Sequence, residues 1–243
     1  TLSGTIQAGG GISFTNSGYV LSGNALLLHD GTNNAPISVA AGKSATISSA
    51  ITYQNNKPAA ITLNPGAVLN LGGGATNSQY NFNGSGSVNM TAGTYNANVG
   101  SVAVATFNQS GGSFNVTPGN NVGLNVSSNS RSVNFTLSGG TLTVNGNNTT
   151  STVNNAYLGI GNGTAISNTS TMTLKNGATV NVGTTSGRSG EIRIANSPES
   201  NGTLDVQGGT LAIGTGDPAN KIYFFKSGTI DAPYLARLNQ SGG

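Results

Sequence analysis

Six carboxylates are the only acidic side chains of this chain, and a pair of them could catalyse glycoside hydrolysis. They are Asp30, Glu191, Glu199, Asp205, Asp217 and Asp231. Such hydrolysis needs two carboxylates that face each other about 5 to 9.5 Å apart. Asp205 stands between two apolar residues, at a strand position where the other repeats carry mainly Thr and Asn. Glu191 shares a strand face with Arg193, and Glu199 and Asp217 adjoin prolines. The spacing therefore predicts a solvated Asp205 and a surface ion pair between Glu191 and Arg193, and no catalytic pair.

Two further patterns resemble chemical sites but lack the geometry that those sites need. His29, the only histidine, precedes Asp30 directly, and neighbouring residues in a strand point to opposite faces. Residues 214–219 read Gly-Thr-Gly-Asp-Pro-Ala, a loose match to a dinucleotide motif, but residues 221–225 then read as a strand and not as the required helix. No Asp ladder of a calcium-binding β-roll is present. We therefore predict no catalytic, cofactor or metal site, and a chain that is not an enzyme.

The composition is far from that of an average globular domain, in which about 25% of residues are charged. The chain has 243 residues, 38 of them Gly, with 6% charged residues, no Cys and a net charge of +3. Its nine basic residues are too dispersed for a nucleic-acid site. No window approaches the roughly 18 apolar residues of a membrane span. Residues 1–10 lack a signal-peptide pattern, so we interpret the sequence as a mature chain or a fragment.

One motif recurs along the chain: two apolar residues stand five and three positions before a glycine. The pairs are Ile37/Val39, Ile61/Leu63, Val88/Met90, Phe107/Gln109, Phe135/Leu137, Met172/Leu174, Leu204/Val206 and Tyr223/Phe225. Gln109 is the only polar member. The glycines that follow them are Gly42, Gly66, Gly93, Gly112, Gly140, Gly177, Gly209 and Gly228, so the local motif is fixed while the connecting loops vary in length. Because side chains alternate between the two faces of a strand, both residues of a pair point to the same face. Stacking the pairs of successive repeats would therefore form one apolar interior.

The residues between the paired positions predict the outward face. They are Ser38, Thr62, Asn89, Asn108, Thr136, Thr173, Asp205 and Phe224, so only the last is apolar. A third kind of strand is expected at 124–126, 158–160 and 192–194, with Asn and Gly at the corners to accept a positive φ. The pattern predicts an all-β fold, a parallel β-solenoid. An up-and-down barrel or a sandwich also needs alternating strands, but it usually has evenly spaced hairpin signals and more surface charge.

Three segments carry a resemblance to a known family. They are GTIQAGGGISFTNSGYVLSG (4–23), FTLSGGTLTV (135–144) and GTLDVQGGTLAIG (202–214). They resemble the passenger-associated β-strand repeats of bacterial autotransporters and related surface proteins. The resemblance implies a right-handed parallel β-helix, secretion, and an extracellular or cell-surface role as an adhesin or fibre.

The carboxy-terminal segment is richer in aromatic and basic residues than the rest. We divide the chain into solenoid repeats at 1–220 and a terminal rung with a cap or interface at 221–243. The interface would use Tyr223, Phe224, Phe225 and Tyr234. The expected partner is a second copy or a neighbouring domain of a longer chain, because an open strand edge must be covered or used. Surface glycans are a further class of partner to consider.

The sequence thus favours a secreted structural or adhesive protein that forms a stiff rod, with head-to-tail fibre assembly as one form of it. A carbohydrate-binding or polysaccharide-degrading β-helix is the alternative. That alternative would need a groove of stacked aromatic and acidic residues, and for it the sequence offers scattered tyrosines such as Tyr53, Tyr80, Tyr95 and Tyr157.

Overall fold

The computed structural model describes residues 4, 6–30, 32–53, 58–76, 79–97, 99–116, 123–128, 131–145, 156–161, 168–184, 190–195, 201–214, 221–224 and 236–242. Every helix or strand assigned within these ranges is a β-strand, and all pairs of named strands are parallel. The chain visits three columns of strands in a fixed order, and we call one such circuit a rung. The predicted all-β, parallel β-helical fold is confirmed.

Each column stacks one strand, or one part of a strand, from successive rungs. Column A holds β2 (Ile12–Phe14), β5 (Ile37–Val39), β8 (Pro58–Leu63), the first parts of β11 (Gln79–Met90) and β13 (Val99–Gln109), β15 (Leu124–Val126), β18 (Ala156–Ile160), β21 (Gly190–Ile194) and β24 (Lys221–Phe224). Column B holds β3 (Tyr19–Leu21), β6 (Ser44–Ile47), β9 (Val68–Leu71), the second parts of β11 and β13, β16 (Val133–Leu137), β19 (Thr169–Leu174), β22 (Asn201–Val206) and β25 (Ala236–Gln240). Column C holds β1 (Ile6–Gln7), β4 (Leu26–Leu27), β7 (Ile51–Thr52), β10 (Ala75–Thr76), β12 (Thr94–Ala97), β14 (Ser113–Val116), β17 (Gly140–Val144), β20 (Ala178–Val182) and β23 (Thr210–Ile213).

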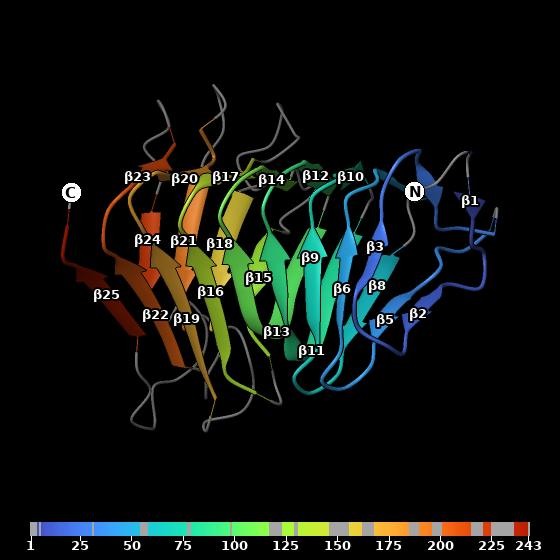
Figure 1. The fold of residues 1–243 in the computed structure, drawn as a ribbon. Helices are drawn as coiled ribbons and strands as arrows, with labels where there is room; N and C mark the ends of the chain where they lie inside the picture. The colour runs from blue at the N-terminus through green and yellow to red at the C-terminus, as the bar shows by residue number, and fades with distance from the viewer. Residues whose placement is uncertain are drawn as a thin grey trace.

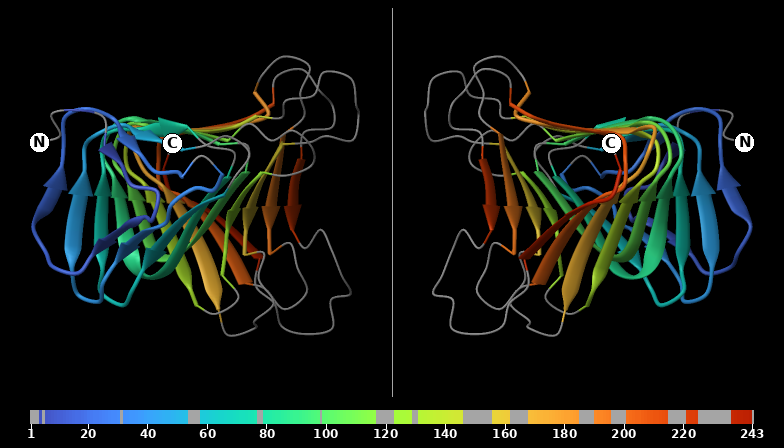
Figure 2. Two further views of the ribbon diagram at one scale, coloured as in Figure 1. Left: turned by 90° about the vertical axis from the view of Figure 1, so that its right-hand side faces the viewer. Right: turned by 90° about the vertical axis from the view of Figure 1, so that its left-hand side faces the viewer.

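The coil is right-handed. In Figure 1 column B rises at the front, column C crosses the top and column A descends behind, while the chain advances from the N-terminus at the right to the C-terminus at the left. Figure 2, turned by 90°, shows the three columns around a common interior. Parallel strands joined by crossovers strongly prefer this hand, because each strand carries a right-handed twist.

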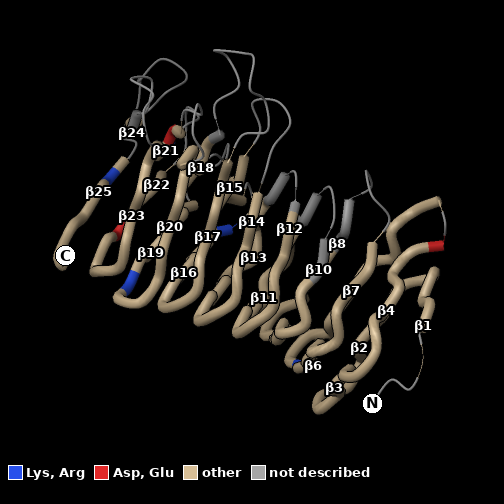
Figure 3. Tube along the Cα trace, turned by 90° about the horizontal axis from the view of Figure 1, so that it is seen from above, with Lys and Arg blue, Asp and Glu red and all other residues tan. Residues whose placement is uncertain are grey.

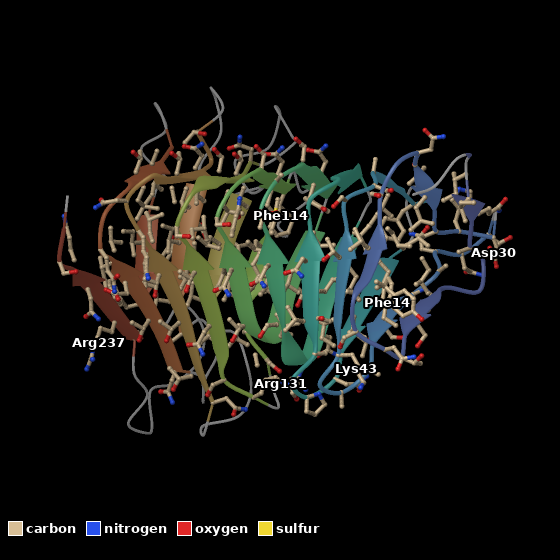
Figure 4. The ribbon with its side chains drawn as sticks, viewed as in Figure 1. Phe14, Asp30, Lys43, Phe114, Arg131 and Arg237 are labelled. Atoms are coloured by element: carbon tan, nitrogen blue, oxygen red, sulfur yellow. The ribbon has the colours of Figure 1, made fainter. Side chains whose placement is uncertain are left out.

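A single apolar core fills the interior, and its residues alternate with polar outward ones. In β16 and β19 the inward residues are buried and the outward ones are not. Aromatic rings are stacked at the centre: Phe107 lies 5.1 Å from Phe82 and 4.8 Å from Phe135 between ring centroids, edge to face. Phe114 belongs to the same group, and Figure 4 labels it among the interior side chains.

The registers confirm most of the predicted repeat and correct two of its steps. Column B pairs Val88, Phe107, Phe135, Met172 and Leu204 in succession, as the motif predicts. The first predicted step, from Ile37 to Ile61, is also confirmed, but it lies in column A. The steps from Gly66 to Gly93 and from Gly209 to Gly228 are wrong, because each joins strands of different columns.

The first of these two errors arises because β11 and β13 pass from column A to column B without a turn. In β11 the register shifts between Gly84 and Ser87, which marks an irregularity at that corner. Gly84 has a φ of 117° and lies so close to the backbone of Leu63 that a Cβ would overlap it. Ile61 therefore pairs with Phe82, and Val88 belongs to the next column.

Glycines occupy the other corners, as predicted. Positive φ angles occur at Gly42, Gly66, Gly93, Gly112, Gly140, Gly177 and Gly209. At Gly140 a Cβ would also overlap the carbonyl oxygen of Gly112 in the preceding rung. Gln109, the polar exception in the inward pattern, lies beside this corner. It is fully buried, and its Nε2 donates to the carbonyl oxygen of Thr141 at 3.0 Å.

Candidate functional site

The ends of the coil expose the apolar interior. Among the described residues, the exposed large hydrophobic side chains all lie in the first or the last rung: Ile6, Tyr19, Val20, Ile222, Phe224 and Leu238. Between the two ends the positions that correspond to Ile6, Tyr19, Ile222, Phe224 and Leu238 are covered by the next rung and are buried, whereas Val20 pairs with the outward Thr46. Scattered apolar residues on a surface need no explanation, but a set confined to the two ends of a stack marks incomplete burial.

At the carboxy-terminal end, β24 stacks on β21. Ile222 and Phe224 pair with the buried Ile192 and Ile194, and Phe224 is 47% exposed because no described rung covers it. The prediction that Phe224 faces outward is therefore wrong, and so is the prediction that Tyr223 faces inward. Tyr223 instead pairs with the outward Arg193, since this strand belongs to column A and not to column B. Phe225 and Tyr234, the other predicted interface residues, lie outside the described residues.

The second strand of this end, β25, stacks on β22, and Leu238 pairs with the buried Leu204. The described parts of the segment 221–243 thus add one strand to column A and one to column B. At the amino-terminal end, Ile6 pairs with the buried Leu26 and Tyr19 with the buried Ala45. Each end therefore presents inward-column residues that have a described neighbour on one side only.

The carboxylates do not form a facing pair among the described residues. Asp205 lies on the outward face of column B beside Thr173, as predicted, and Gln207 donates to it at 2.7 Å. Asp30 lies at the opposite end of the coil from Arg237 (Figure 4) and accepts the backbone N–H of Thr32 and Asn33, which lowers the pKa of its carboxyl. Glu199, Asp217 and Asp231 lie outside the described residues.

Glu191 and Arg193 form the predicted ion pair, but Glu191 is buried. Arg193 contacts the carboxylate through Nη2 at 2.6 Å and through Nε at 2.7 Å, and the side chains of Glu191 and Arg193 are 2% and 15% exposed. The guanidinium lies over the ring of Tyr157, 4.0 Å from its centroid. Tyr157 pairs with Glu191 in register, and Asn125 Nδ2 donates to the Tyr157 hydroxyl at 3.4 Å. We call Asn125, Tyr157, Glu191, Arg193 and Tyr223 the column A cluster.

The outward face of column B is different and nearly uncharged. Asn108 Nδ2 donates to Asn89 Oδ1 at 3.0 Å, and Asn89 Nδ2 donates to Asn70 Oδ1 at 3.0 Å. We call these three residues the amide ladder. Thr136 and Thr173 continue the same position in later rungs. Figure 3 shows how few charged residues lie along the coil.

The tyrosines that the carbohydrate-binding or polysaccharide-degrading alternative would need are buried where their side chains are described. Tyr53 and Tyr95 are buried in the interior, Tyr157 is stacked under Arg193, and the side chain of Tyr80 is not described. Within the described ranges His, Asp and Glu nowhere gather in groups of three that could hold a metal ion. Those ranges also contain no helix long and apolar enough to cross a membrane.

Comparisons with protein-family models, with curated proteins and with solved structures each returned no match.

Proposed function

We propose that this chain is a secreted structural element of a cell surface, a stiff β-helical rod whose open ends contact further β-helical rungs. One observation carries the proposal: at both ends, apolar side chains stand in register with the buried columns and have a described rung on one side only. A rung of the same kind would cover them and would also pair the free strand edges.

Three further observations support an extracellular rod. The chain has no cysteine and few charges, and its segments resemble passenger-associated β-strand repeats of autotransporters. The core is continuous from the first rung to the last, which makes the coil stiff along its axis. The outward face of column B carries small neutral polar side chains, which suit a shaft better than a reaction site.

The partner at the ends is a second copy, in a head-to-tail contact. The two ends are different surfaces, so such a contact is heterologous and propagates along the axis instead of closing. The flanking rungs of a longer chain would use the same contact in cis. In either case we expect the role to be structural or adhesive and not enzymatic.

Electron microscopy and analytical ultracentrifugation of the purified chain test this proposal. The wild type should form particles whose lengths are multiples of one coil, and Phe224→Asp should shift them to single coils while the β-rich circular dichroism spectrum is unchanged. Thr136→Asp is the matched control, because it adds the same charge to the outward face between the neutral Asn108 and Thr173, away from both ends of the rod. A wild type that remains a single coil at its highest soluble concentration would contradict the second-copy contact.

A further inference from the structure

In each column, one inward row of residues runs unbroken through every rung of the coil. From first to last residue, the rows lead from Ile6 to Leu211 in column C, from Ile12 to Phe224 in column A and from Tyr19 to Leu238 in column B. Figure 1 shows the strands that hold the first residues, β1 to β3, at one end and those that hold the last, β23 to β25, at the other. The two ends therefore share one pattern of inward positions.

The open positions at the ends are the first and last residues of these rows. Ile6, Tyr19, Phe224 and Leu238 are exposed, whereas Ile12 and Leu211 pack partly against the core. All six are apolar, so each row offers an apolar residue at both ends. The described residues up to Leu28 include no Asp, Glu, Lys or Arg, so the amino-terminal end brings no charge to a contact.

We propose that two copies join in register, with the last residue of each row beside the first residue of the same row in the second copy. Three apolar pairs then form across the junction: Leu211 with Ile6, Phe224 with Ile12, and Leu238 with Tyr19 of the second copy. This inference rests on the end-to-end contact proposed above and specifies which strands meet: β23 and β1, β24 and β2, β25 and β3. The strands remain parallel, as they are within the coil, and the free edges at the junction are paired.

Other arrangements fit the two ends less well. A shift of the second copy by one residue turns its outward residues inward. A shift by two residues places Ile6 beside Gly209 and Tyr19 beside Ala236, which offer little or no side chain to cover. Two equal ends would meet with antiparallel strands and could align at most one column with itself.

The outward row of column B reports on the register directly. It begins at Val20 and ends at Asn239, and both residues are exposed. In the proposed register these two residues are neighbours across the junction, about 4.8 Å apart like residues of any adjacent strands. A disulfide spans Cα atoms about 4.4 to 6.8 Å apart. The chain contains no cysteine, so Val20→Cys/Asn239→Cys introduces the only two thiols.

Oxidation of this double variant, followed by electrophoresis without reductant, tests the inference. We expect a ladder of covalent multimers that collapses to the single chain when reductant is added. Ser22→Cys/Asn239→Cys is the matched control, because position 22 lies two residues further along and its Cα would be about 8 Å from that of position 239, beyond the reach of a disulfide. Its multimers should be about tenfold less abundant.

A second variant tests the junction without cysteines. Tyr19→Asp changes the residue that meets Leu238 of the neighbouring copy, and we expect it to shift the particles to single coils in electron microscopy, as Phe224→Asp does. Tyr19 is exposed in the free coil, so the circular dichroism spectrum should not change. Unchanged particle lengths in Tyr19→Asp would contradict the proposed pairing.

The outcomes separate the register from the rod. Multiples of one coil together with a ladder from Ser22→Cys/Asn239→Cys, and none from Val20→Cys/Asn239→Cys, would overturn the register and leave the rod intact. Cross-linked dimers of Val20→Cys alone would show that equal ends meet, which contradicts the head-to-tail contact as well. A wild type that remains a single coil would remove the rod and the register together.

Discussion

Columns A and B both consist of parallel strands and enclose the same interior, yet the side chains on their outward faces interact in different ways. On column B, Asn70, Asn89 and Asn108 repeat one neutral hydrogen bond from rung to rung. On column A, the later rungs bring Tyr157, Glu191 and Arg193 together in a contact that occurs once among the described rungs. A repeated contact suits a shaft, because every rung needs the same support. A contact that occurs once among the described rungs breaks the symmetry of the coil.

The interior beneath both faces should respond most strongly to mutation. Leu137 is fully buried in β16, and Leu137→Asp places a carboxylate among apolar columns, so we expect a loss of about 4 kcal/mol or more in unfolding free energy. Guanidinium unfolding followed by circular dichroism measures it. Asp205→Asn, on the outward face of column B, should change stability by less than about 0.5 kcal/mol. Equal losses in the two variants would show that the inward and outward assignments are wrong.

The column A cluster should be the most sensitive outward region. Glu191→Gln leaves the mostly buried Arg193 without a charged partner, and we expect a loss of about 3 kcal/mol. Replacing both residues by Met should recover part of this loss, because no unpaired charge then remains buried. Unfolding curves of Glu191→Met, Arg193→Met and the double variant give the coupling energy. Additive effects of the two single variants would mean that the coupling energy is zero and that the ion pair itself does not stabilise the fold.

The interior behind column C should make the fold sensitive to alkali. Burial raises the pKa of Tyr95 to about 12 and also raises that of Tyr53. Because the folded-state pKa lies above the unfolded value of about 10, the stabilisation is complete below pH 10 and is lost as the pH rises towards 12, by about 2 kcal/mol for Tyr95. Unfolding free energies at pH 9 and pH 11.5 test this. Tyr95→Phe should reduce the difference between them, whereas Tyr19→Phe, at an exposed position, should not.

The amide ladder should give the smallest measurable effect. Asn89→Ala removes one hydrogen bond to Asn70 and one from Asn108, but these groups are partly exposed and water can replace the lost partner. We expect a loss of about 1 kcal/mol, measured as a shift of the thermal midpoint. A loss as large as that of Glu191→Gln would remove the distinction between the two faces.

Much of the fold follows from the sequence because strand alternation is a local property. Pairs such as Phe135/Leu137 and Met172/Leu174 face inward as predicted, and Thr136 and Thr173 face outward. The column to which a strand belongs is not local. The motif places Val88 in the column of Ile61 because both residues stand five positions before a glycine. In the structure β11 passes at Gly84 from column A to column B without a turn, so Val88 lies in column B. Gly84, inside an otherwise alternating stretch, is the available signal for this irregularity.

The candidate sites are harder to predict because they depend on contacts between rungs. The pairing of Glu191 with Arg193 follows from their spacing, but the burial of Glu191 does not, since Tyr157 comes from another rung. Aligning residues 221–224 with 191–194 would give the orientation of Phe224, because Ile222 then falls on Ile192. Counting back from Gly228 gives the opposite orientation, with Tyr223 facing inward and Phe224 outward.

The parallel pairing of the rungs has a mechanical consequence. The hydrogen bonds between rungs run along the axis of the coil, so a pull on its two ends loads the bonds of one terminal rung at a time. Each rung that opens releases its whole length of chain: the segment from Phe107 to its partner Phe135 would extend to about 95 Å. A rod of this kind under tension lengthens stepwise from its ends, and the rungs that are still wound keep their side chains in place.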